Sequence, residues 1–476
     1  MVEHSATVAA TSEVGRVVAD LEIRRAWLVD PAGGREGPGE IVVQDGRLEA
    51  LTWLEGAEAE GVEPTGVIVA PGFIDLHAHL REPGSEDAET IASGLAAAAH
   101  GGFTTVCAMA NTDPAIDEPG VLARILAAAG ASGSPIELLA YGATTVGRAG
   151  STLAPLGELS DTGAIGFSDD GAPVRSAAIL RNALLYAGML GRPIVEHAED
   201  LELTEGAEAN EGLVATVLGL KGWPAAAEAG PVARGLAILA DVLPDEPRAR
   251  LHFTHLSTAA ALELIRRAKV AGLPVTCDVT PHHLALTDTW LAGVRDWAWQ
   301  DGPSAWLGTG QPARPYDSAL RVNPPLRDRS DAAACLAALI DGTADAVATD
   351  HAPHRQVDKA VEFGLAANGI SGIETAIGLL LAAVDDGRLP LLRAIEALTS
   401  GPAAILGLAG WPGTRGLLEG APANLVVIDR SDDWLVEPGS LRSKGKASPL
   451  IGRTLPGRVL LTIAGGRVAF QVPDPA

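Results

Sequence analysis

Residues 67–84 read VIVAPGFIDLHAHLREPG, an apolar β-branched run that ends in two histidines and a turn. His77 and His79 are two residues apart, so on an extended strand both imidazoles point to the same face. Two neutral imidazoles on one face can chelate one divalent ion. Arg81 follows on that face, and a fixed cation beside a metal site favours an anionic substrate. Because an isolated His-x-His is more often a structural pair, the remaining ligands must come from elsewhere in the chain.

The composition is that of a large, acidic, globular protein. The 476 residues suffice for two or three ordinary domains, or for one (β/α)8 barrel with an accessory domain. With 47% hydrophobic and 20% charged residues, we expect a large core. The net charge of −25 argues against nucleic acid and anionic membrane surfaces as partners.

The three cysteines, Cys107, Cys277 and Cys335, bear on the compartment. None lies in a Cys-x-x-Cys motif and they cannot build a disulfide framework, which indicates the reducing cytoplasm. The N-terminal residues lack the apolar core of a signal peptide. No apolar run reaches the length of about 18 residues that a membrane span needs.

Short apolar runs separated by turns occur at both chain ends. Residues 1–18 are predicted to be a flexible tail, and residues 19–70 to contain strands with a hairpin turn at Asp45-Gly46. The pattern returns within residues 403–476, in ANLVVIDRSDDWLV and GRVLLTIAGGRVAF. Since neither end has enough strands to be stable alone, the two are predicted to form one small β-sandwich domain.

Between the ends, residues 71–402 alternate β-runs with Ala-rich helices. Eight β-runs joined by helices predict a parallel sheet, and eight strands close a TIM (β/α)8 barrel. Residues 296–317, rich in Trp, Gly and Pro, interrupt the alternation and are predicted to be an inserted loop. The predicted strands cover residues 73–79, 104–110, 136–141, 164–168, 193–197, 251–255, 275–279 and 346–349, and the main helices cover 88–100, 119–129, 177–190, 259–271 and 331–341.

Polar residues follow the predicted strands at the end where a TIM barrel has its active site. They are His77, His79, Arg81, Asn111, Asp169, Asp170, His197, His255 and Asp350. A single histidine at a strand end is more often structural, but five strands that deliver ligands to one rim indicate a site. Four imidazoles and at least two carboxylates fit two divalent ions sharing a carboxylate, with Zn²⁺ favoured. The predicted reaction class is metal-assisted hydrolysis at a carbonyl.

From about Val42 to Val468 the chain resembles the amidohydrolase superfamily and, within it, the dihydroorotases of the bacterial class I type. The motifs PGFIDLHAHLREPG, ANTDPAID, GFSDDG, EHAED, THLST, TPHH, NPPLR and DHAPH occur in the family's order. The resemblance implies reversible hydrolysis of (S)-dihydroorotate to N-carbamoyl-L-aspartate by a metal-bridged hydroxide, in pyrimidine biosynthesis. A homodimer is also expected from the family.

The resemblance implies roles for particular residues. Two Zn²⁺ per chain would share Asp170 and a hydroxide; His77, His79 and Asp350 would hold one ion, and His197 and His255 the other. Some relatives bridge the ions with a carboxylated lysine, but no lysine lies between Arg81 and Lys221. Asp350 would be catalytic by carrying the proton. Substrate contacts are implied for His79, Arg81, Asn111, Asn323, His354, Asn368 and Gly369, the last two through the backbone.

Two alternatives stay open. Other cyclic amidases, such as allantoinases and hydantoinases, share the His-x-His, but they typically have a bridging lysine and lack an arginine two residues later. Arg81 and Asp170 therefore argue against them. A non-catalytic partner of aspartate transcarbamoylase is disfavoured because every ligand position is filled, although an active chain that also docks on that enzyme is compatible with the sequence.

Overall fold

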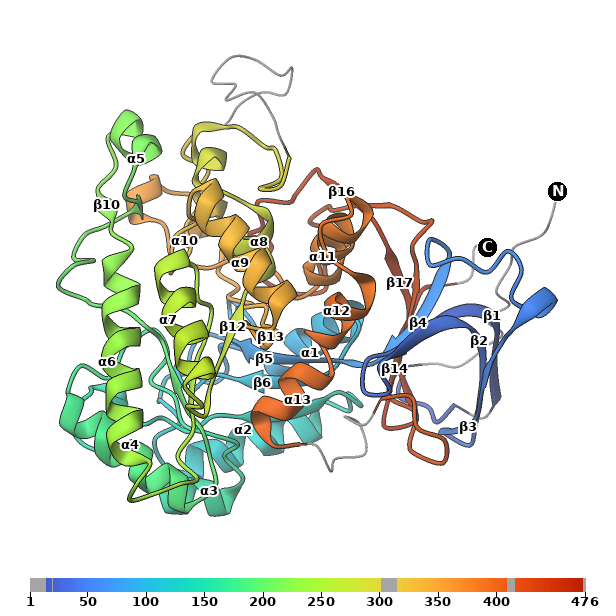
Figure 1. The fold of residues 1–476 in the computed structure, drawn as a ribbon, viewed down its shortest axis with the longest axis horizontal. Helices are drawn as coiled ribbons and strands as arrows, with labels where there is room; N and C mark the ends of the chain where they lie inside the picture. The colour runs from blue at the N-terminus through green and yellow to red at the C-terminus, as the bar shows by residue number, and fades with distance from the viewer. Residues whose placement is uncertain (1–13, 19, 301–314, 409–415, 474–476) are drawn as a thin grey trace.

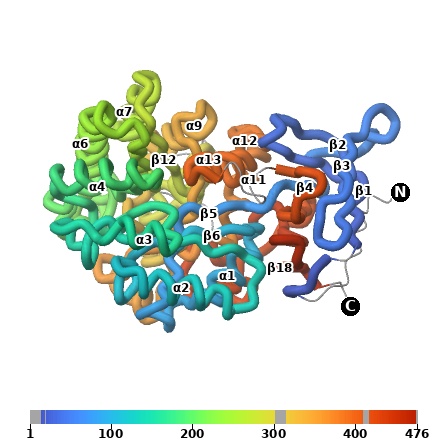
Figure 2. Tube along the Cα trace, turned by 90° about the horizontal axis from the view of Figure 1, so that it is seen from below, coloured from blue at the N-terminus to red at the C-terminus, as the bar shows by residue number. Residues whose placement is uncertain are grey.

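A computed structural model describes residues 14–18, 20–300, 315–408 and 416–473. An α/β part and a β-rich part lie side by side along the long axis of the molecule (Figure 1). Both ends of the described chain lie in the β-rich part (Figure 2). Residues 301–314, which make up most of the predicted insertion, fall outside the described residues.

One seven-stranded sheet combines strands from both chain ends, in the order β18-β17-β14-β4-β1-β2-β3. Its central strand β4 pairs parallel with β1 and antiparallel with β14, so the two ends interleave. Asp45 and Gly46 have φ of 48° and 74°, as a two-residue hairpin turn requires, which confirms that prediction. The strands are β1 (Asp20–Asp30), β2 (Arg35–Gln44), β3 (Arg47–Trp53), β4 (Val67–Pro71), β14 (Leu425–Asp429), β17 (Arg458–Ala464) and β18 (Arg467–Gln471); β15 (Trp434–Leu435) pairs with β16 (Thr454–Leu455).

All seven strands contribute to one apolar cluster that contains no helical residue. Its members are buried, so the sheet covers its own apolar face by curving over it. A bridge between Arg47 and Pro422 brings the β3 edge to the opposite half of the sheet. Within the predicted tail, Gly15 donates its N–H to Val468 O at 2.7 Å, which places these residues along β18.

The α/β part contains two groups of parallel strands, β5-β6-β7 and β8-β11-β12-β13. Phe167 joins them through single bridges to Gly142 and to Ile194. In the segment predicted as a strand at 164–168 only Phe167 forms bridges, but the backbone bonds to both neighbours: the Ile165 N–H donates to Ala140 O at 3.1 Å and the Phe167 N–H to Pro193 O at 3.1 Å. The strands are β5 (Phe73–Ala78), β6 (Phe103–Ala108), β7 (Glu137–Ala140), β8 (Ile194–Glu196), β11 (Leu251–Phe253), β12 (Val275–Val279) and β13 (Ala346–Val347); β9 (Ala209–Asn210) pairs with β10 (Gly222–Trp223).

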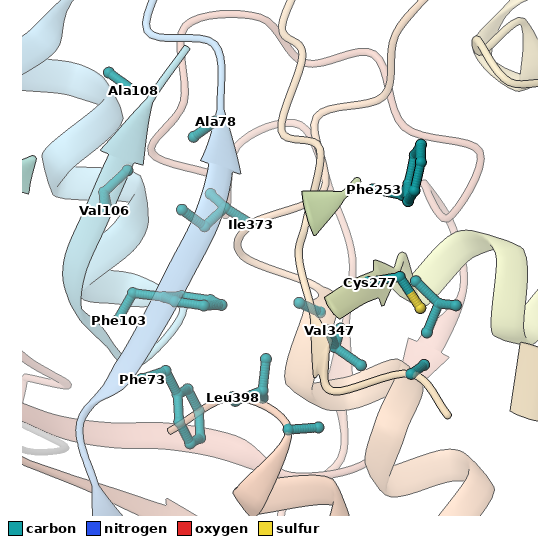
Figure 3. Packing of buried hydrophobic residues seen from close by; sticks show 14 of the residues in the cluster. Phe73, Ala78, Phe103, Val106, Ala108, Phe253, Cys277, Val347, Ile373 and Leu398 are labelled. Carbon is teal, nitrogen blue, oxygen red and sulfur yellow. The ribbon is translucent and has the colours of Figure 1, made fainter. Parts of the chain in front are cut away.

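Alternate residues of these strands face two different apolar clusters. Val106 of β6 lies in the larger cluster, which includes helical residues, whereas Cys107 lies in a smaller one with Leu139 of β7 and Val195 of β8. Side chains alternate along a strand, so both faces of these strands are buried, as expected for parallel strands. Figure 3 shows Phe73 of β5 beside Phe103 of β6, with ring centroids 5.6 Å apart.

Helices cover the parallel strands (Figures 1 and 2). The five main helices predicted from the sequence occur within a few residues of their expected bounds, as α1, α2, α4, α7 and α9. None of the described helices is long and apolar enough to cross a membrane. The α-helices are α1 (Ile91–His100), α2 (Pro119–Ala131), α3 (Leu156–Thr162), α4 (Ala177–Met189), α5 (Leu213–Leu218), α6 (Ala226–Val242), α7 (Ala259–Val270), α8 (Pro281–Ala285), α9 (Arg329–Asp341), α10 (Gln356–Lys359), α11 (Ala376–Asp385), α12 (Leu391–Glu396) and α13 (Ser400–Leu406). The predicted domain boundary at 402/403 falls inside α13.

Candidate metal and substrate site

Six side chains meet where the parallel strands end. They are His77 and His79 of the β5 end, Asp170 after the bridge residue Phe167, His197 after β8, His255 after β11 and Asp350 after β13. All six are buried, with exposed fractions between 1% and 6%. The structure therefore brings together the six residues for which the sequence suggests metal binding.

The carboxylate of Asp170 lies between two pairs of histidines. Its Oδ2 atom is 3.3 Å from His77 Nε2 and 3.5 Å from His79 Nε2. Its Oδ1 atom is 3.5 Å from His197 Nδ1 and 3.3 Å from His255 Nε2. Each oxygen faces one pair, which is the arrangement that a carboxylate bridging two ions requires.

Asp350 contacts only the first pair. Its Oδ1 atom is 3.1 Å from His79 Nε2 and 3.5 Å from His77 Nε2. The first group of donors therefore has two imidazoles and two carboxylates, whereas the second has two imidazoles and Asp170. Three protein ligands with one position left for water or substrate are typical of a catalytic zinc ion.

The spacing of the donors fits metal coordination. The facing imidazole nitrogens are 3.1 Å apart in the His77–His79 pair and 3.0 Å apart in the His197–His255 pair. Ligands at about 2.0–2.1 Å around a tetrahedral zinc ion are about 3.3–3.4 Å from one another. Buried nitrogens whose lone pairs converge need a shared cation, because otherwise each remains desolvated. The side chains present therefore fit a pair of divalent ions.

The other ring nitrogen of the first two histidines has a partner of its own. His77 Nδ1 is 2.7 Å from Thr254 Oγ1, and His79 Nδ1 is 2.8 Å from Asn111 Oδ1. Such partners hold the proton on one nitrogen and aim the lone pair of the other at the ion. Since its oxygen is engaged, the amide nitrogen of Asn111 is the atom suited to meet an anionic substrate.

Glu199 orients the third histidine and also reaches a predicted substrate contact. Its Oε2 atom is 2.8 Å from His197 Nε2 and accepts a hydrogen bond from Asn323 Nδ2 at 3.0 Å. Thr204 Oγ1 donates to its other oxygen at 2.5 Å. Burial alone would raise the pKa of Glu199, but the hydrogen bond and charge of His197 lower it to about 2. An ionised Glu199 therefore links His197, in the second group of donors, to Asn323, a predicted substrate contact.

The clustered charges shift one another's pKa. Burial opposes protonation of His77, but the carboxylates of Asp170 and Asp350 raise its pKa to about 9. Burial likewise opposes ionisation of Asp170, yet the surrounding imidazoles hold its pKa well below the usual range. Bound cations would take over this role, keeping the carboxylates ionised and the imidazoles neutral.

Three residues of the site have backbone conformations that are unfavourable for side chains. Arg81, His255 and Asp350 have φ of 61°, 42° and 45°. A non-glycine residue in the left-handed region costs of order 1–3 kcal/mol, and such residues cluster at functional sites. The His255 N–H is held there by Asp278 Oδ1 at 2.7 Å. The strained residues coincide with the predicted ligands and substrate contacts.

Arg81 and His354, two of the predicted substrate contacts, lie next to each other. Arg81 Nε donates to Pro353 O at 3.1 Å, and His354 Nε2 is 2.7 Å from Asn368 O. Burial and the neighbouring Arg81 guanidinium lower the pKa of His354 to about 4, so its neutral ring donates this proton to Asn368 O. Arg81 Nη2, 3.3 Å from the same nitrogen, can only donate and stays available for an anion.

Arg81 and His354 also border a cleft of about 440 Å³. The remaining lining residues are Gly84, Ser85, Glu86, Asp87, Ala88, Arg355 and Asp358. Gly369 lies against His354: its φ is 147°, and a Cβ there would come within 2.9 Å of His354 Nε2 and 2.5 Å of Ala352 O. Only glycine allows this close approach. Of the predicted substrate residues, Arg81 and His354 line this cleft, and Gly369 packs against His354.

Buried acids behind the histidines were not found from the sequence. Asp75 Oδ1 accepts the Thr349 N–H at 2.9 Å and the His77 N–H at 3.3 Å. Asp278 lies 2.8 Å from His252 Nε2 as well as bonding His255. The only signal was an aspartate within each apolar strand, which does not reveal its partners.

Comparison with known proteins assigns the family. A family described as "Dihydro-orotase-like" matches residues 66–244. The dihydroorotase of Anaeromyxobacter dehalogenans (strain 2CP-C) is 45% identical over 95% of this chain and 98% of its own. That of Pelotomaculum thermopropionicum is 42% identical over the same shares.

Solved structures support the same architecture. The L-hydantoinase of Arthrobacter aurescens has a TM-score of 0.78 at 23% identity, over 96% of this chain and 97% of its own. The dihydropyrimidinase of Brevibacillus agri has a TM-score of 0.73 at 20% identity, over 95% of both chains. At these identities the likeness concerns the fold, whereas the two dihydroorotases match in sequence over almost their whole length. The chain therefore belongs to the dihydroorotase family.

Proposed function

We propose that this protein catalyses the reversible hydrolysis of (S)-dihydroorotate to N-carbamoyl-L-aspartate in pyrimidine biosynthesis. The observation that carries the proposal is the Asp170 carboxylate between two buried histidine pairs, with each oxygen facing one pair. The arginine at position 81 adds a cation for an anionic substrate, and dihydroorotases cover nearly the whole chain at 45% identity.

When bound, two divalent ions, in this proposal Zn²⁺, would supply a hydroxide nucleophile at neutral pH and polarise the amide carbonyl. His77, His79 and Asp350 would hold one ion, His197 and His255 the other, and Asp170 both. The donor separations of 3.0–3.5 Å support this division.

The chain's own residues bind the substrate and move the proton. The Arg81 guanidinium offers a planar fork for a carboxylate, and Asn111 can donate from its amide nitrogen. Asn323 and the backbone at Asn368 and Gly369 suit the ring amide. Asp350 would accept the proton of the nucleophile and deliver it to the leaving amide nitrogen, and the reverse transfer would serve ring closure.

We also propose a closed barrel, a cytoplasmic location and two assemblies for this protein. A closed (β/α)8 barrel is supported by the bridge between Ala78 and His351 and by the His79 N–H donating to His351 O at 2.8 Å. A cytoplasmic location is supported by three buried free cysteines. We propose a homodimer, and aspartate transcarbamoylase as a candidate partner; sedimentation of the chain with and without that enzyme tests both.

Turnover of a panel of cyclic amides tests the activity. The purified protein should hydrolyse dihydroorotate and cyclise carbamoyl aspartate, and it should leave allantoin, hydantoin and dihydrouracil unchanged, because these neutral rings lack the carboxylate that Arg81 would bind. Faster turnover of any neutral ring would assign the chain a different cyclic amide. Inactivity on all of them would favour the non-catalytic alternative.

A further inference from the structure

Lys359, the last residue of α10, is a buried lysine that contacts the backbone of Gly369, a predicted substrate contact. Its exposed fraction is 5%. Its Nζ donates to the backbone carbonyls of Ala367 at 2.8 Å, Gly369 at 3.0 Å and Arg321 at 3.1 Å. The described residues give it no ion pair; the three carbonyl oxygens are its hydrogen-bond partners, and burial lowers the pKa of its ammonium group to about 7, although the charge of Asp317 opposes this. A buried cation costs free energy unless it is hydrogen-bonded, and here the ammonium group donates to three carbonyls.

The three carbonyls belong to two segments that meet at Lys359. The first includes Arg321 and leads to Asn323. The second contains Asn368 and Gly369. Further bonds join them: the Gly369 N–H donates to Arg321 O at 2.9 Å, and Arg321 Nε donates to Asn368 Oδ1 at 3.0 Å. Lys359 is the charged centre of this junction.

The junction around Lys359 fixes the position of the Asn368 carbonyl, which is the hydrogen-bond acceptor for His354. Asn368 lies between two of the residues that Lys359 holds, and its carbonyl accepts the His354 Nε2 proton at 2.7 Å. The ring of His354 in turn lies 3.3 Å from Arg81 Nη2. Gly369 approaches His354 and Ala352 so closely that a Cβ does not fit, so a small shift of this backbone would displace the ring. A misplacement of about 1 Å at a binding group can cost about a hundredfold in rate.

We propose that Lys359 is a positioning residue for the substrate: its ammonium group fixes the backbone at Arg321, Ala367 and Gly369 and thereby the Asn368–His354–Arg81 side of the cleft. This inference rests on the proposed function for the identity of the substrate. Lys359 makes no contact with the six predicted metal ligands, so its effect is on substrate binding and leaves the metal content unchanged.

Three variants test the proposal: Lys359→Met removes all donors, Lys359→Gln keeps an amide donor, and Lys269→Met is the matched control. Lys269 Nζ also donates to a backbone carbonyl, that of Gly342 at 3.2 Å, and to Asp345 Oδ2 at 2.6 Å, but it lies at the amino end of β13. Each variant is assayed for KM, kcat, metal per chain and Tm.

For Lys359→Met we expect the KM for dihydroorotate to rise about tenfold or more, kcat to fall less, and the metal content to match wild type. The KM of Lys359→Gln should lie between those of wild type and Lys359→Met. The control Lys269→Met should lower Tm while leaving KM within about twofold of wild type. If both Lys359 variants kept the wild-type KM while Tm fell, the lysine would be only structural. If Lys359→Met does not fold, Lys359→Gln decides alone.

Wild-type turnover separates this test from that of the proposed function. If wild type were inactive on dihydroorotate, the proposed function would fail, and the same KM comparison would be made with whichever cyclic amide it hydrolyses. If wild type were active and the Lys359 variants unchanged in KM, only the role of Lys359 would be overturned.

Discussion

One aspartate side chain determines how the four histidines can act together. Each Asp170 oxygen is 3.3–3.5 Å from the nitrogens of one histidine pair, so neither oxygen serves both pairs. Asp169, its neighbour, faces away: it accepts the Thr145 N–H at 3.0 Å, and burial raises its pKa. Two adjacent aspartates therefore have different roles because the backbone turn points their side chains in different directions.

Glu199 gives a prediction at the residue scale. Glu199→Gln replaces the ionised acceptor of His197 with a neutral amide, and loss of such a partner typically weakens metal affinity about 10–100-fold. We expect this loss for the second ion, measured by chelator competition on the purified variant. The accompanying weaker contact to Asn323 Nδ2 should raise KM for dihydroorotate.

Glu202→Gln is the control for that measurement. Glu202 lies three residues later and pairs with Arg175 at 3.0 Å, where both side chains are well exposed. Metal affinity of this control should equal that of wild type. Equal affinity in Glu199→Gln as well would show that His197 does not depend on Glu199.

At the scale of elements, short buried strands position the site, and one of them carries an acid with a shifted pKa. Glu137 begins β7, and burial raises the pKa of its carboxyl to about 7. The folded chain therefore retains a proton that the unfolded chain has lost. The contribution of Glu137 to stability is present below the ordinary glutamate pKa of 4.5 and is lost as the pH rises through about 7.

Glu137→Gln should remove this dependence. Because glutamine is neutral at every pH, the variant should melt about 1–3 °C above wild type at pH 8 and close to it at pH 4.5. Melting curves at both pH values, with the exposed Glu158→Gln as control, measure the difference. A constant difference at both pH values would contradict the pKa assignment.

The elements could be predicted from sequence where a local pattern determines them. The Asp45-Gly46 turn and the helices behind β6 and β12 have strong local signals. The segment 164–168 forms bridges only at Phe167, although Ile165 and Ser168 also donate backbone hydrogen bonds to Ala140 and Gly142. Strand ends predicted a constellation of polar residues because parallel strands bring their carboxyl ends together, and the family resemblance singled out the six ligands among them. The roles of Glu199 and Lys359 could not be predicted, since they depend on side chains and carbonyls that meet only after folding.

In the whole molecule, the C-terminal segment is bonded to residues behind the site as well as to the N-terminal strands. Glu374 accepts the N–H of Arg442 at 2.8 Å and of Ser443 at 3.0 Å, and Glu89 accepts that of Lys444 at 3.2 Å. Glu89 Oε2 is also 3.5 Å from the Nε2 of His351, the residue after Asp350. The C-terminal segment therefore packs directly behind the β13 end of the site.

Metal content, measured together with dihydroorotate turnover on the same purified sample, tests the central claim most directly. The geometry predicts close to two ions per chain in wild type and in the surface control Asp161→Ala. Asp170→Ala should hold at most one ion and lose more than about a hundredfold in turnover, since a direct ligand matters more than the partners behind it. Two ions and full turnover in Asp170→Ala would contradict the account.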